Sequence, residues 1–141
     1  MTYSFAVSTL ADAAKSMQAD LQAAIFGHLK ATLTKPVFDN VPQETPAPYY
    51  SLGFPISTSY ETDGRVGLNI LMPIHSWSEY HGKGEVLLMQ REVYAALHRA
   101  KLTITGYNCI SILQENETMN LDPDGVTRHG IQQFRILIMS A

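Results

Sequence analysis

Residues 37–53 read Val-Phe-Asp-Asn-Val-Pro-Gln-Glu-Thr-Pro-Ala-Pro-Tyr-Tyr-Ser-Leu-Gly, and this stretch decides how the chain enters its β-structure. Pro42, Pro46 and Pro48 exclude a helix here, because proline lacks a backbone N–H and restricts the residue before it. The stretch therefore predicts a strand, a stiff exposed loop and a second strand that opens with Tyr49-Tyr50. Such a loop loses little freedom when a partner binds, although a rigid connector without a partner is the commoner use of a loop.

The composition predicts one folded domain that spans residues 1–141. Hydrophobic residues make up 45% of the chain and charged residues 16%, which favours a packed core over disorder. The net charge is −3 and the pI is about 5.9. Because nucleic acids and anionic membranes are usually bound through a basic patch, this balance favours neither as a partner.

Cysteine usage and targeting signals restrict the chain further. The single cysteine, Cys109, cannot form an internal disulfide, and its apolar surroundings predict a buried, unreactive thiol. Residues 1–10 lack the basic start and apolar core of a signal peptide. No apolar run approaches the roughly 20 residues of a membrane span, so we expect no membrane role.

Two helices are predicted from the spacing of apolar residues. The first covers residues 8–33, and Ser8 or Thr9 is expected to cap its start. The residues that recur at helical intervals in it are Leu10, Met17, Leu21, Ala24, Ile25, His28 and Leu29. The second covers residues 84–100, with an apolar stripe and with basic residues expected at its C-terminal end. The residues of that stripe are Val86, Met89, Val93, Ala96 and Leu97.

The remaining segments predict β-strands. Residues 49–60 and 66–77 are expected to form a long hairpin around the Asp63-Gly64 turn, with Pro73 interrupting or bending the second strand or placing it at an edge. Further strands are expected at 102–105, 107–119 and 126–139, the last of them central in the sheet. The order of elements predicts an α+β fold with a largely antiparallel β-sheet and two main helices packed on one face.

Motifs for catalysis or metal binding are weak. His75, Glu79 and His81 form the best local set of metal ligands, but no HExxH or CxxC spacing accompanies them. Glu115 and Glu117 are expected on one solvated face of a strand. The sequence therefore predicts no catalytic residue, no cofactor and no metal, with a small metal-dependent hydrolase that uses the histidine set as the less favoured alternative.

Three stretches in this order resemble the small tail-completion proteins, or tail terminators, of long-tailed bacteriophages, prophages and gene transfer particles. The first is 37–53, with its Val-Pro-Gln, Pro-Tyr and Leu-Gly elements. The second is His-Ser-Trp-Ser at 75–78, followed by Gly82 and Gly84-Glu85. The third is Asp-Pro-Asp-Gly-Val-Thr-Arg-His-Gly at 122–130, leading to Phe134-Arg135.

This resemblance implies a structural assembly protein, not an enzyme. It implies a homo-oligomeric ring, commonly a hexamer, that caps the tail tube, ends tube polymerisation and joins the tail to the head. The implied partners are further copies of the chain, the tail tube protein and the head connector or stopper protein. DNA is expected to pass through the lumen without specific binding. The implied location is the head–tail junction of the virion, after assembly in the bacterial host cytoplasm. Another connector component or a minor tail protein remains an alternative.

The resemblance also directs attention to three exposed segments and three arginines as interface candidates. The loop at 41–48 is the candidate for a subunit or tube contact, while the two turns are candidates for docking surfaces or lumen edges. The arginines are candidates for ion pairs between subunits, and Trp77 is assigned to the core because it ends an apolar strand. The candidate interface residues are Val41, Pro42, Gln43, Pro46, Pro48, Asp63, Gly64, Arg65, Asp122, Asp124, Gly125, Arg128 and Arg135.

Overall fold

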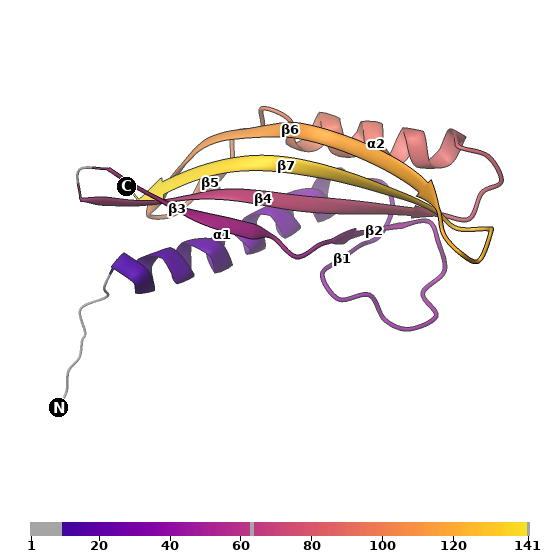
Figure 1. Ribbon diagram of the computed structural model, residues 1–141, viewed down its shortest axis with the longest axis horizontal. Coiled ribbons are helices and arrows are strands. Elements are labelled where there is room, and N and C mark those ends of the chain that lie inside the picture. Colours follow the sequence, from indigo (N-terminus) through magenta and orange to yellow (C-terminus); the bar gives the residue numbers. More distant parts are fainter. Residues whose placement is uncertain (1–9, 63, 141) are drawn as a thin grey trace.

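The computed structural model describes residues 10–62 and 64–140 and contains two helices and a seven-stranded sheet (Figure 1). The helices are α1 (Leu10–Thr32) and α2 (Gly84–Leu97). The strands are β1 (Val37–Phe38), β2 (Tyr49–Leu52), β3 (Ile56–Thr62), β4 (Arg65–Ser78), β5 (Thr103–Ile104), β6 (Tyr107–Leu121) and β7 (Arg128–Ser140). The α+β prediction is confirmed, since every strand pair except β1–β2 is antiparallel.

The first helix follows the predicted periodicity. Met17, Leu21, Ile25 and Leu29 are fully buried at intervals of four residues, so one face of α1 enters the core. The cap expected at Ser8 or Thr9 lies outside the described residues. Of the described helices, none is long and apolar enough to span a membrane.

The predicted hairpin across residues 49–77 is confirmed by its register, which places Tyr49 opposite Trp77. The first arm is not continuous, however. It is divided into β2 and β3, which both pair with β4, and the break falls at residues 53–55. Gly53 is needed at this break, because a Cβ there would lie 2.6 Å from Nε2 of His75 and 2.7 Å from Cγ of Pro73.

The expectation that Pro73 interrupts the second arm, or places it at an edge, is wrong. β4 continues through Pro73, which lies opposite Gln133 of β7. On its other side the carbonyl of Pro73 accepts a 2.8 Å hydrogen bond from the backbone N–H of Gly53. In an antiparallel strand the N–H and C=O of one residue point the same way, so the missing donor of Pro73 faces the break between β2 and β3. No ladder hydrogen bond is lost there.

β7 lies in the middle of the sheet, as predicted, between β4 and β6. Alternate residues of β4 are buried from Val66 to Ile74, and the matching residues of β7, including Phe134, Ile136 and Ile138, are buried beside them. These residues form one hydrophobic cluster with the buried faces of α1 and α2. Both helices therefore cover the same face of the sheet and lie behind it in Figure 1.

The second helix ends earlier than predicted. α2 stops at Leu97, and the backbone at His98 is extended. Arg99 then adopts a positive φ of 62°, and its N–H donates to the carbonyl of Ile112. The basic residues expected in the last helical turn therefore follow the helix instead. Cys109 is half-buried against the core, and burial raises the pKa of its thiol.

Candidate docking site at one end of the sheet

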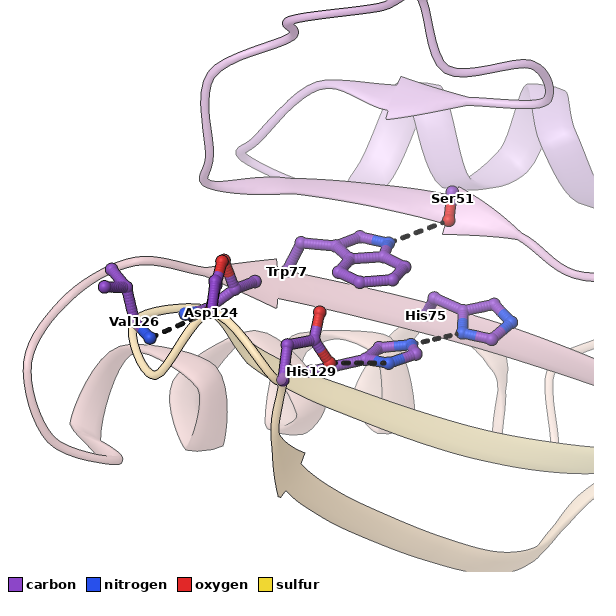
Figure 2. A network of polar contacts seen from close by, with 8 residues as sticks. Ser51, His75, Trp77, Asp124, Val126 and His129 are labelled. Carbon is purple, nitrogen blue, oxygen red and sulfur yellow. Dashed lines mark hydrogen bonds and ion pairs between the residues drawn. The ribbon is translucent and has the colours of Figure 1, made fainter.

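The face of the sheet that the helices do not cover carries a row of rings. Trp77 of β4 and His129 of β7 lie opposite each other in register, and their rings stack with centroids 3.7 Å apart. Tyr49 of β2 stacks on the other side of the indole at 6.1 Å. The indole Nε1–H donates a 3.0 Å hydrogen bond to Oγ of Ser51, as Figure 2 shows. The stack thus ties β2, β4 and β7 together near one end of the sheet.

The second histidine of this face extends the row. Nδ1 of His75 lies 2.6 Å from Nε2 of His129, so the two rings share one proton in a hydrogen bond (Figure 2). Burial lowers the pKa of both imidazoles, and for His75 the neighbouring His129 lowers it further. A carboxylate oxygen of Asp122 lies 3.8 Å from Nδ1 of His129, and its negative charge partly offsets the lowering of the His129 pKa. Both rings are therefore neutral at physiological pH, mainly because burial excludes water from them.

A small polar cavity of about 190 Å³ opens beside the stack. Its walls come from the 41–48 loop, the ends of β2 and β4, and the turn between β6 and β7. Burial, and then the carboxylates of Glu79 and Asp122, raise the pKa of the Tyr49 phenol at its edge. Among the described residues that line the cavity none is a lysine or arginine, so it is acidic. The lining residues are Thr45, Ala47, Tyr49, Trp77, Glu79, Asp122 and Thr127.

The turn between β6 and β7 is built around one carboxylate. Asp124 accepts hydrogen bonds from the backbone N–H groups of Val126 and Thr127 and from the Thr127 hydroxyl, at 2.7–2.8 Å. These bonds, led by that of the Thr127 side chain, lower the pKa of Asp124. Gly125 has a φ of 73°, which favours glycine. The turn is thus shaped by its own hydrogen bonds.

The structure brings two of the three predicted segments together. The 41–48 loop and the Asp122–Gly125 turn share the acidic cavity and lie at the same end of the sheet (Figure 1). Within the loop, Pro42, Gln43 and Pro46 are exposed, while Val41 and Pro48 are half-buried. The third segment lies elsewhere. Gly64 and Arg65 are exposed at the opposite end, at the β3–β4 hairpin, and Asp63 lies outside the described residues.

The remaining arginine candidates bind groups of their own chain. The guanidinium of Arg135 makes a bidentate pair with Glu115, at 2.7 and 2.8 Å, and a 3.0 Å hydrogen bond to Asn69. Arg128 donates to the carbonyl of Val126 at 2.7 Å. Their role in ion pairs between subunits stays a prediction.

Two sequence-based assignments are wrong. Trp77 is not in the core but half-buried on the open face, because it lies an odd number of residues from the buried Ile70 and Ile74. Glu115 and Glu117 do not share a face. A bulge between Gln114 and Asn116 lets Glu115 reach Arg135, while Glu117 accepts a hydrogen bond from Gln114.

The histidine set proposed for a metal does not form one site. His75 pairs with His129, whereas the exposed ring of His81 stacks on Tyr80. Among residues 10–62 and 64–140, no group of three or more His, Cys, Asp or Glu side chains is placed to hold a metal ion. The site thus consists of stacked rings beside an acidic cavity.

Sequence reasoning missed a further group of residues. Leu87, Leu88 and Tyr94 of α2 are exposed, and so are Phe54 and Ile56 at the break between β2 and β3. The available signal was the apolar pair Leu87-Leu88, about two turns before Tyr94, on the side of α2 away from its predicted stripe.

Comparisons with known proteins show which family this chain resembles. A model of the family described as "Tail completion protein gp17" matches residues 23–139. The tail completion protein gp17 of Bacillus phage SPP1 is 31% identical over 96 residues, which cover 68% of this chain and 71% of that protein. A chain in the solved structure "Virion of native gene transfer agent (GTA) particle" superposes with a TM-score of 0.78 at 20% identity, over 87% of this chain and 97% of that chain. The solved SPP1 gp17 protein aligns with a TM-score of only 0.45 at 24% identity, over 90% of this chain and 88% of that chain.

The family match covers most of the chain and defines a class: structural proteins of the virion tail, which are not enzymes. The chain belongs to the tail completion protein gp17 family. The resemblance seen in the sequence is thereby confirmed, and so is the placement of the protein in the virion.

Proposed function

We propose that the protein forms a ring on the last ring of the tail tube, ends tube polymerisation and joins the tail to the head connector. The observation that carries this proposal is the arrangement of docking elements along the sheet. The 41–48 loop and the Asp122–Gly125 turn lie at one end, and the β3–β4 hairpin lies at the other (Figure 1). A protein that joins two structures needs a contact surface at each end.

Closed rings require contacts between copies of the chain, and exposed apolar side chains support such contacts. Phe54 is 95% exposed, and Leu88 of α2 is 59% exposed. Apolar surface of this kind gains free energy when a neighbour covers it. For the number of subunits in the ring, we propose the hexamer that the sequence resemblance implies.

The charge of the chain supports a passive lumen. With a net charge of −3 and a pI of about 5.9, the protein has no overall attraction for phosphates. Phosphate contacts drive non-specific DNA binding, so DNA is expected to pass through the ring without being held. We propose no specific DNA contact.

Electron microscopy of particles assembled with and without the protein tests this function. Tails of uncontrolled length in its absence, restored to normal length by the wild-type protein, are the expected result. Tails of normal length beside unjoined full heads point instead to another connector component. Normal joined particles without the protein contradict the proposal as a whole.

A variant of the loop separates docking from folding. Gln43 is exposed at the tip of the 41–48 loop, so Gln43→Arg adds bulk and charge without disturbing the core. We expect this variant to fold normally and to cap tails poorly. Thr103→Arg, at an exposed site on β5, is the matched control for added charge away from this end.

A further inference from the structure

Helix α2 has an apolar surface on both sides. Its inner side buries Val86, Met89 and Val93 in the core. Its outer side exposes Leu87, Leu88 and Tyr94, with 48%, 59% and 42% of their surfaces in water. A helix that covers a core normally presents polar residues to water, and one that is apolar all round is normally buried. The outer side of α2 also carries the exposed Arg91, so it is not apolar all round, but its three large apolar side chains remain open to a partner.

A cavity of about 340 Å³ lies at the N-terminal end of this outer side. Leu88 and the exposed ring of Tyr80 line it, together with Gly84, Glu85 and Lys35. Gly84 has no neighbouring atom within 4 Å of the position where a Cβ would lie, so the cavity mouth is open. One aromatic ring of a partner fits a hollow of this size and lining.

The same chain carries a projecting aromatic side chain. Phe54 is 95% exposed at the break between β2 and β3, and Ile56 beside it is 66% exposed. The backbone that presents Phe54 is fixed, because Gly53 packs against Pro73 and His75 and donates to the Pro73 carbonyl, while Pro55 restricts the other side. A side chain held in this way loses little freedom on docking.

We propose that Phe54 of one copy inserts into the cavity beside Leu88 on α2 of the next copy. The occupant is a second copy of this chain, because the chain itself supplies both the projecting ring and an open hollow with leucine and tyrosine in its lining. The segment from 51 to 60 contains no charged residue, which matches a contact made by leucine and tyrosine. This contact presupposes the ring proposed above and identifies its subunit interface.

The two surfaces belong to different parts of the fold. Phe54 lies on the β2–β3 flank of β4, while α2 packs against β4, β7 and β6 from the helix-covered face. A contact between two different surfaces is head-to-tail, and repetition of such a contact generates a closed ring when the rotation closes. A contact of each surface with itself would stop at a dimer.

Site-directed cross-linking tests the contact in assembled particles. In a Cys109→Ser background, Phe54→Cys and Leu88→Cys are introduced singly and together, and particles are treated with a short thiol cross-linker. The double variant is expected to give a ladder of covalent oligomers, because the thiol introduced by Phe54→Cys in one copy meets the thiol introduced by Leu88→Cys in the next. Neither single variant is expected to give a ladder.

Three outcomes overturn the contact: a double variant that is incorporated without forming a ladder, a covalent dimer from Phe54→Cys alone, or cross-links to a different protein. These outcomes leave the ring function intact if microscopy shows a ring of the protein on the tail. Wild-type particles that lack any such ring contradict the proposed function itself.

A capping assay provides a second measurement that does not depend on cysteine chemistry. Phe54→Ala and Leu88→Ala are each expected to raise the protein concentration that caps half of the tail tubes at least tenfold, as truncation at the centre of an interface does. Ile110→Ala, at an apolar site 46% exposed on β6, is the matched control and is expected to leave that concentration unchanged. As a check on folding, the free energy of unfolding of Phe54→Ala must equal that of the wild type. If both variants cap tails at the wild-type concentration, the contact is overturned.

Discussion

The indole ring of Trp77 lies on the imidazole ring of His129, with centroids 3.7 Å apart and ring planes 10° apart. The two residues come from neighbouring strands and face away from the core. Tyr49 stacks on the indole from the third strand. Since Tyr49 and Trp77 also line the acidic cavity between the 41–48 loop and the 122–125 turn, the stack fixes one wall of that cavity.

Trp77→Ala is therefore expected to lower the free energy of unfolding by about 2 kcal/mol, somewhat less than truncation of a fully buried tryptophan costs. Ser51→Ala is the matched control, since it removes only the acceptor of the indole N–H bond and is expected to cost about 1 kcal/mol. Urea denaturation of both variants measures the difference. If Trp77→Ala lowers the free energy of unfolding no more than Ser51→Ala does, the stacking contributes nothing to stability.

The histidine pair predicts a loss of stability in mild acid. Both imidazoles have a pKa below the ordinary value in the folded protein, so the unfolded chain binds more protons than the folded chain. Their contribution is complete above the unfolded pKa of about 6.5 and falls as the pH drops towards the lowered folded pKa. The carboxyl groups of Glu92 and Asp124 also have a lowered pKa. Their contribution to stability is lost in a separate pH range, below about pH 4.5.

Urea midpoints between pH 8 and pH 5 check this expectation. The wild type should lose stability steadily below about pH 6.5. His75→Gln removes one of the two groups and should flatten the curve in that window. An equally steep curve in His75→Gln assigns the pH dependence to other groups.

Much of the fold was readable from the chain because local patterns determine it. Alternation from Val66 to Met72 predicts β4, the Asp63-Gly64 turn predicts the hairpin, and four-residue spacing predicts α1. The same alternation places Trp77 on the face opposite Ile70, so its position on the open face was also readable. The prediction placed Trp77 in the core because its strand is apolar, and it did not use this alternation.

The site itself could not be read from the chain. The 41–48 loop and the 122–125 turn meet only because β2 and β7 both pair with β4, and strand order is a long-range property. The continuity of β4 through Pro73 likewise depends on a break in the neighbouring strand, which the sequence of β4 does not contain.

Gly67 predicts a sensitive position in the sheet. A Cβ at Gly67 would lie 2.6 Å from the backbone oxygen of Tyr60 and 3.1 Å from that of Ile138. Backbone atoms of two paired strands cannot yield as a flexible side chain can, so Gly67→Ala is expected to destabilise the protein by about 1–3 kcal/mol. Denaturant unfolding measures this loss, and a variant as stable as the wild type means that β3 and β4 separate at this point without cost.

Gly27 predicts the opposite result. It is an exposed residue in the interior of α1, and no atom lies within 4 Å of the position where a Cβ would be. Alanine loses less conformational freedom than glycine on forming a helix, so Gly27→Ala is expected to raise the free energy of unfolding by about 0.5–1 kcal/mol. Ala31→Gly, one turn later on an exposed part of α1, is the reverse control and should lower it by a similar amount. Because Gly27→Ala adds only one methyl group to an open surface, a more stable variant that no longer caps tails would place this side of α1 in a contact between proteins.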